Sequence, residues 1–103
     1  MLTVIETPLF SKLWPDYWTD DERTNFAAHL SVNPDAGDVI PRSGGCRKIR
    51  WTRAGSGKRG GVRVIYYNQL ADGSVVLLLI YAKSVQDTIA PAVLRKLVEE
   101  LSS

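Results

Sequence analysis

The fold is decided by residues 61–82, whose sequence is GVRVIYYNQLADGSVVLLLIYA. Two runs rich in β-branched and aromatic residues, Val62 to about Gln69 and Val75 to Ala82, flank the turn-forming pair Asp72-Gly73. Such runs on either side of Asp-Gly predict a β-hairpin. The second run is apolar over eight residues, well short of the roughly 20 that a membrane-crossing helix needs. We therefore predict a core strand there.

The segment before this hairpin predicts another strand. From Gly44 the sequence alternates, with Ile49 and Trp51 on one side and Lys48 and Arg50 on the other. A period of two is typical of a strand whose faces meet different surroundings. A glycine-rich connection, residues 54–61, leads from this strand into the hairpin. We expect the three strands to be antiparallel neighbours.

The flanking segments predict one more strand and three helices. They are a strand at Leu2 to Ile5, a helix from Thr7-Pro8 to about Trp14, a helix from Thr19-Asp20-Asp21-Glu22 to about Val32, and a helix from Pro91 capped by Thr88 or Ala90. Capping residues and apolar spacing support each helix. The order β-α-α-β-β-β-α indicates an α+β fold, and 103 residues fit one domain, residues 1–103.

Charge is sorted along the chain, although the formal net charge is only +2. Residues 42–71 hold eight cations and no carboxylate, whereas residues 1–41 hold two cations and seven acids. A block of one sign on a surface attracts a polyanion, and nucleic acid is the leading candidate. A regulator that reads DNA with a helix is the weakest alternative, because no predicted helix carries an exposed basic row.

Four cations are expected to converge on one sheet face. Lys48 and Arg50 share a strand, Arg63 lies on the strand hairpinned to it, and Lys83 ends the strand after that. Neighbouring strands lie about 4.8 Å apart, so such cations can surround one phosphate. The alternative is a solvated polar face, but like charges on adjacent strands repel, which favours an anionic partner.

The glycine-rich connection GSGKRGG, residues 55–61, matches the pattern G-x-G-x-x-G. A dinucleotide site needs a helix after these glycines, whereas a strand follows here. A Walker A loop is excluded because Arg59 stands where Ser or Thr binds magnesium. Two interpretations of this connection remain: an ordinary mobile loop, or a loop that contacts a phosphate backbone along its length. The cations assigned to RNA or ribosome binding are Arg47, Arg53, Lys58 and Arg59.

No metal or cofactor is expected. The chain has one histidine and one cysteine, and the basic segment lacks paired carboxylates, so it offers neither the zinc nor the magnesium ligand set. His29 is predicted to be structural or solvated, and Cys46 a small strand residue. A single cysteine and no leader-like apolar stretch favour a reducing cytoplasm.

Aromatic residues lie close in sequence to the cations. Tyr66, Tyr67 and Tyr81 are candidates for stacking on a base of single-stranded RNA, with Tyr66 and Tyr81 assigned to RNA binding. The alternative for such tyrosines is core packing. Trp14, Trp18 and Trp51 are predicted to join the two N-terminal helices to the sheet.

Two blocks of sequence resemble the HigB branch of the RelE toxin superfamily. They are NPDAGDVIPRSGGCRKIRW, residues 33–51, and GSGKRGGVRVIYY, residues 55–67, followed by LLLIYAK ending at Lys83. The likeness covers nearly the whole chain and implies a RelE-like fold, with an N-terminal strand and a helical hairpin packed on a twisted antiparallel sheet.

The resemblance also implies a function. Such toxins are metal-independent endoribonucleases of type II toxin-antitoxin modules that cut messenger RNA on the ribosome. A helix-turn-helix antitoxin typically inhibits them and represses the operon, so operator DNA is reached only through that partner.

The same resemblance implies residue roles. Arg63 matches the arginine expected to stabilise transition-state charge, Lys48 and Arg50 match basic positions of the preceding strand, and Lys83 matches the cation ending the last strand. Since like charge disfavours protonated lysine, Lys48 or Lys83 is the candidate general base or acid. Residues 84–90 lack the arginine and tyrosine of some relatives, so the alternative is a non-catalytic RNA- or ribosome-binding translation inhibitor.

Overall fold

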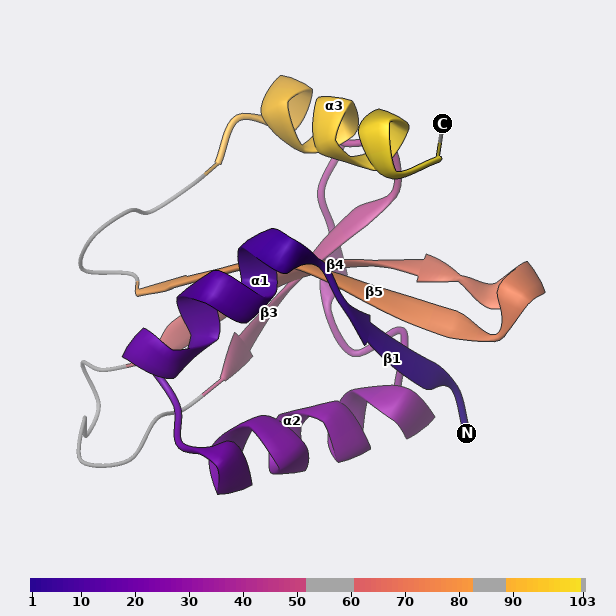
Figure 1. Cartoon of the computed structure of the whole chain (residues 1–103). Helices are drawn as coiled ribbons and strands as arrows, with labels where there is room; N and C mark the ends of the chain where they lie inside the picture. The colour runs from indigo at the N-terminus through magenta and orange to yellow at the C-terminus, as the bar shows by residue number, and fades with distance from the viewer. Residues whose placement is uncertain (52–60, 83–88, 103) are drawn as a thin grey trace.

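A computed structural model describes residues 1–51, 61–82 and 89–102. In this part of the chain, helices pack on both faces of one five-stranded sheet (Figure 1). The elements in chain order are β1 Thr3–Glu6, α1 Pro8–Leu13, η1 Trp14–Asp16, α2 Asp20–Val32, β2 Asp38–Val39, β3 Cys46–Trp51, β4 Val62–Gln69, η3 Leu70–Asp72, β5 Ser74–Ala82 and α3 Pro91–Ser102. The predicted α+β class is confirmed.

The sheet has the strand order β1-β5-β4-β3-β2. The three predicted neighbours, β3, β4 and β5, are antiparallel as expected. The sequence did not predict the partner of the N-terminal strand: β1 pairs with β5 in parallel, from Thr3 opposite Ser74 to Glu6 opposite Leu77. Two residues that the sequence did not mark as a strand, β2, pair with β3 at the other edge.

Two of the predicted helix starts have the capping geometry that their sequences indicate. The Thr7 hydroxyl accepts a hydrogen bond from the Phe10 amide at 3.2 Å, and Pro8 occupies the first helical turn. Thr19 and Glu22 form a complete capping box. Each arrangement satisfies amide donors that have no partner within the helix.

The sheet separates two apolar clusters. The first lies on the side of α1 and α2 and is rich in aromatic residues, which are Phe10, Trp18 and Phe26, with Trp14 and Trp51 packed against it. The Trp18 ring contacts Phe26 in a tilted arrangement, and Phe26 contacts Trp51 edge-on. The predicted role of the tryptophans as a bridge between helices and sheet is thus confirmed.

The second cluster lies on the other side, beneath α3. It contains Cys46, Ile65 and Tyr67 from the sheet and Leu94 from the helix. The apolar spacing predicted from Pro91 onward explains this packing, because Leu97 and Val98 follow Leu94 by three and four residues and so share its face of the helix. None of the helices in the described ranges is long and apolar enough to cross a membrane.

A β-bulge changes which side chains face α3. Ile65 of β4 pairs with Leu79, but the next residue, Tyr66, pairs with Leu77, so β5 has Leu78 as an extra residue. An extra residue reverses the alternation of the strand beyond it. Leu77 therefore belongs to the first cluster, whereas Tyr81, four residues later, belongs to the second.

Candidate functional site

Three cations lie together on the sheet face beneath α3. In β3, Ile49 belongs to the first apolar cluster and Cys46 to the second, so alternation places Lys48 and Arg50 on the side of α3. Arg63 is the Cα partner of Arg50 on β4. The predicted convergence of Lys48, Arg50 and Arg63 on one face is confirmed.

The cations of this face are not neutralised by acids in the described part of the chain. The ion pairs there join Arg23 to Glu6 and Asp20, and Arg47 to Asp35. Lys48, Arg50 and Arg63 take part in none of them, although Arg63 is only 9% exposed. Like charges placed directly opposite on neighbouring strands destabilise a sheet, and a charge removed from water without a partner costs free energy. This arrangement is suited to an anionic ligand.

Tyr81 completes the row formed by Arg50 and Arg63. It is the Cα partner of Arg63 on β5, and the bulge turns its side chain toward α3. Only 7% of its surface is exposed, and its assignment to RNA binding stays a prediction. The bulge is a feature that neither the composition nor the alternation of β5 revealed.

Arg47 lies on the opposite face from Lys48 and Arg50. Its guanidinium donates to the Gly37 carbonyl oxygen at 2.8 Å and lies 3.4 Å from the Asp35 carboxylate. These contacts fasten the loop that follows α2 to the sheet. The structure does not bring Arg47 to the other cations, and its assignment to RNA binding stays a prediction.

The assignment of Tyr66 to base stacking is wrong. Tyr66 is fully buried in the first cluster, on the face away from the cations. Its hydroxyl donates to the Pro34 carbonyl oxygen at 2.8 Å and accepts from the Gly37 amide at 2.9 Å. Burial raises the pKa of this hydroxyl despite the Gly37 bond and the nearby Arg47 charge. Alternation along β4 already separates Tyr66 from Arg63.

Cys46 and His29 are structural, as predicted. Burial raises the pKa of the Cys46 thiol, against the smaller opposing effect of its hydrogen-bond partner Ser43. The raised pKa favours the protonated form of the thiol at neutral pH. The His29 ring packs 5.0 Å from Trp51, on the side of α2. Among the described residues, no three His, Cys, Asp or Glu side chains gather in a metal-binding group.

Some predicted site residues lie outside the described ranges. They are the catalytic candidate Lys83 and the RNA-binding candidates Arg53, Lys58 and Arg59. The glycine-rich connection that carries the last two, and the departure from relatives noted after Lys83, fall mainly in the same segments. Their roles stay predictions.

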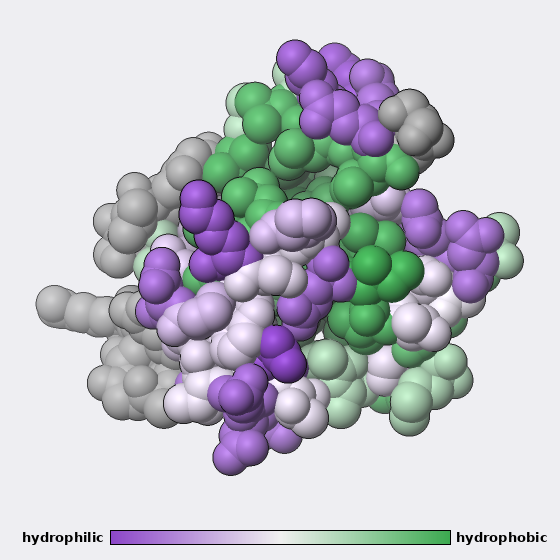
Figure 2. Space-filling view, in the orientation of Figure 1, coloured by the Kyte–Doolittle hydropathy of each residue, from purple (hydrophilic) through white to green (hydrophobic). Residues whose placement is uncertain are grey.

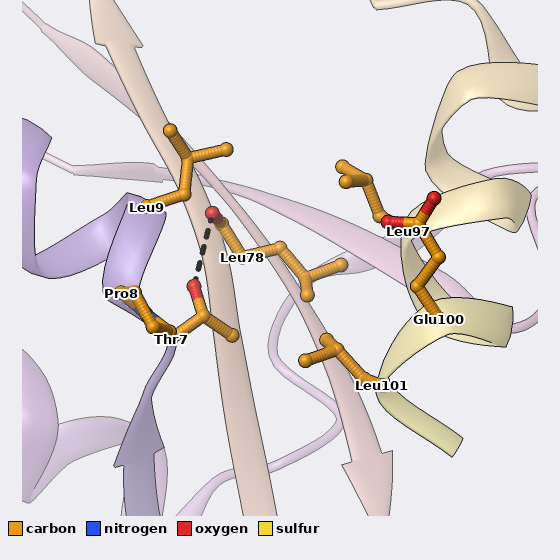
Figure 3. Close-up of a pocket in the computed structure, with 7 residues that line it drawn as sticks. All are labelled: Thr7, Pro8, Leu9, Leu78, Leu97, Glu100 and Leu101. Carbon is orange, nitrogen blue, oxygen red and sulfur yellow. Dashed lines mark hydrogen bonds between the residues drawn. The ribbon is translucent and has the colours of Figure 1, made fainter. Parts of the chain in front are cut away.

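An apolar groove lies between the start of α1, strand β5 and α3. Figure 3 shows Leu9, Leu78, Leu97 and Leu101 around it, with the Thr7 hydroxyl directed at the backbone of β5. Figure 2 shows hydrophobic residues gathered beneath α3 in the same region. Glu100 is the charged residue among the described ones that line the groove. This apolar groove with an acidic residue does not suit a phosphate.

The comparisons with known proteins bear on the fold. No family model matches the sequence. The chain is similar in structure to a doubly substituted mutant of the Escherichia coli toxin RelE in the free state, with a TM-score of 0.60, 13% sequence identity, and coverage of 84% of this chain and 87% of that one. The protein therefore has a RelE-like fold, with three cations of β3 and β4 gathered on the sheet face beneath its last helix.

Proposed function

We propose that this protein is the toxin of a type II toxin-antitoxin module and a metal-independent endoribonuclease that cuts messenger RNA on the ribosome. The observation that carries the proposal is the position of Arg63 directly opposite Arg50, with Lys48 two residues along the same face and no ion pair to a described carboxylate. The RelE-like fold supports it, and the sequence blocks around Lys48 and Arg63 favour the HigB branch.

The proposed reaction needs no group beyond the chain and the RNA. The ribose 2′-oxygen attacks the adjacent phosphorus while the bond to the 5′-oxygen of the next nucleotide breaks. A 2′,3′-cyclic phosphate and a 5′-hydroxyl result. One group takes the proton of the 2′-hydroxyl and another supplies a proton to the leaving oxygen. Lys48 and Lys83 are the candidates for these two steps.

Arg63 and Arg50 stabilise the charge that develops on the phosphate oxygens. A guanidinium presents several donors in a planar fork that matches phosphate geometry. Because Arg63 is almost fully buried between β3 and β5, its side chain is held in place before the substrate arrives. Preorganised donors of this kind lower a barrier without reorganisation during the reaction.

The proposed partners follow from the proposed function. The ribosome presents the messenger RNA, with Arg53, Lys58 and Arg59 as contacts predicted from the sequence. The predicted contact of Arg47 competes with its ion pair to Asp35. The module acts in the cytoplasm. An antitoxin, of the helix-turn-helix type in the HigB branch, inhibits the toxin and links it to operator DNA.

Induction of the chain without an antitoxin tests the proposal. We expect growth arrest and new RNA 5′ ends inside translated reading frames, mapped by primer extension. Arg63→Ala should lower cleavage by about 10²- to 10³-fold, the loss typical for one oxyanion-stabilising donor. Lys12→Gln, which removes a charge from α1, is the matched control and should cut normally. Stalled ribosomes without new 5′ ends would instead indicate inhibition by occupancy alone.

A further inference from the structure

We propose that a cavity beside Lys48 binds one nucleobase of the RNA, next to the phosphate that Arg50 and Arg63 hold. This inference rests on the proposed function and adds to it a binding site for the base. The cavity has a volume of about 290 Å³, at the small end of the range of roughly 300 to 1,000 Å³ for ligand pockets. It has room for a flat base rather than for a larger ligand.

The walls of the cavity come from the sheet and from the segment that leads into α3. They are formed by Ile40, Lys48, Ile65, Tyr81, Ile89, Ala90 and Pro91. Isoleucine and proline side chains with one aromatic ring make an apolar lining with a single cation. Such a lining favours the face of an aromatic base, which loses little on leaving water and stacks without regard to its hydrogen-bonding pattern.

Lys48 connects the cavity to the proposed site of cleavage. It lines the cavity and lies two residues from Arg50 on the same face, a distance of about 7 Å along a strand. That distance matches the reach from a phosphate across its ribose to its base. One nucleotide is thus able to place its phosphate at Arg50 and Arg63 and its base against Ile65 and Tyr81.

The charges near this cavity also favour a phosphate group at its rim. The first turn of α3, which begins at Pro91, contains no acidic residue. The positive end of the α3 dipole and the Lys48 ammonium therefore act in the same direction on an approaching anion. The apolar interior of the cavity is thus complementary to the base of a nucleotide, and its cationic edge to the phosphate.

Methyl NMR of the full chain tests the cavity directly. The protein has six isoleucines, of which Ile40, Ile65 and Ile89 line the cavity, whereas Ile49 and Ile80 belong to the opposite cluster and Ile5 is on β1. Adenosine 5′-monophosphate should shift the first three methyl signals and leave the other three unchanged. Ribose 5-phosphate, which lacks only the base, should bind at least about tenfold more weakly. Equal responses to the two ligands would overturn the proposal.

A pair of matched variants adds a second test. Ala90→Leu enlarges a residue at the rim of the cavity, and Ala92→Leu makes the same change two residues later, outside the lining. Ala90→Leu should weaken binding of adenosine 5′-monophosphate by at least about fivefold, whereas Ala92→Leu should not change it. Equal affinities of the two variants would refute a base in this cavity.

The outcomes separate this inference from the proposed function. If the nucleotide shifts the three cavity methyls but induction produces no cleavage, the base site stands and the nuclease is wrong. If induction produces cleavage that depends on Arg63 while adenosine 5′-monophosphate leaves the cavity methyls unmoved, the nuclease stands and the base site is wrong.

Discussion

Strand β3 carries arginines on both of its faces, and the groups that surround the guanidinium differ between the two faces. Arg47 points to the side of α2, where Asp35 and the Gly37 carbonyl oxygen meet its guanidinium. Arg50 points to the side of α3, where its cross-strand partner is another arginine, Arg63. The first arrangement ties a loop to the sheet, and the second places two cations opposite each other without an ion pair to any carboxylate of the described residues. Arg47 and Arg50, three residues apart in the sequence, thus face different charges in the structure.

The largest expected effect comes from giving Arg63 a carboxylate partner, as Arg47 has in Asp35. Arg50→Glu places a carboxylate opposite Arg63 and should lower RNA cleavage by about 10²- to 10³-fold, because the pair neutralises the charge meant for the phosphate. The same change should raise the free energy of unfolding by about 0.2 to 1 kcal/mol through an opposite-charge pair across the strands. Cleavage assays and urea denaturation measure the two quantities.

Arg50→Gln is the matched control for that reversal. It removes the repulsion from Arg63 without adding an acid, so its activity should lie between those of the wild type and Arg50→Glu. A reversed variant that cut RNA at the wild-type rate would show that Arg50 and Arg63 do not act on the phosphate together.

A smaller effect is expected from the hydroxyl that supports the Arg47 side. Tyr66→Phe leaves the buried Gly37 amide and Pro34 carbonyl oxygen without this partner, which should cost about 1 to 3 kcal/mol of unfolding free energy. The cleavage rate of the folded protein should stay near that of the wild type, since Tyr66 faces away from the cations. Thermal unfolding and a rate normalised to folded protein measure this. A stable variant with slow cleavage would contradict the separation of the two faces.

The smallest expected effect is on the salt dependence of ribosome binding. For a single-stranded nucleic acid, each neutralised phosphate makes the fall of log K with log salt concentration steeper by about 0.7. Arg50→Gln should reduce the slope by about that amount, and Arg47→Gln should leave it unchanged because Asp35 already meets its charge. Binding measured at several salt concentrations gives both slopes. A reduced slope for Arg47→Gln would place this residue at the RNA, as the sequence suggested.

Local signals in the sequence were enough for much of this fold. Thr7-Pro8 and the capping box at Thr19 act within a few residues of each helix start. Asp72-Gly73 favours the turn between β4 and β5 because Gly73 adopts a left-handed φ of 69°. The parallel pairing of β1 with β5 escaped prediction because no short-range pattern distinguishes one long-range partner from another. The same is true of β2, which is only two residues long.

The site was predictable where alternation alone decides the face. Lys48, Arg50 and Arg63 follow the period of two, and the same rule separates Arg47 and Tyr66 from them once it is applied strictly to each strand. Tyr81 needed the bulge, whose position depends on how β4 and β5 fit together. Ile40 and Pro91 line the cavity through the approach of separate segments, which a single sequence does not encode locally.

The parallel pairing of β1 with β5 has a consequence for synthesis. The strand partners of Thr3 to Glu6 are Ser74 to Leu77 of β5, so most of the polypeptide must leave the ribosome before that edge of the sheet can close. Long-range contacts of this kind form late and slowly. During translation the nascent chain thus passes through a long interval in which this edge of the sheet is still open.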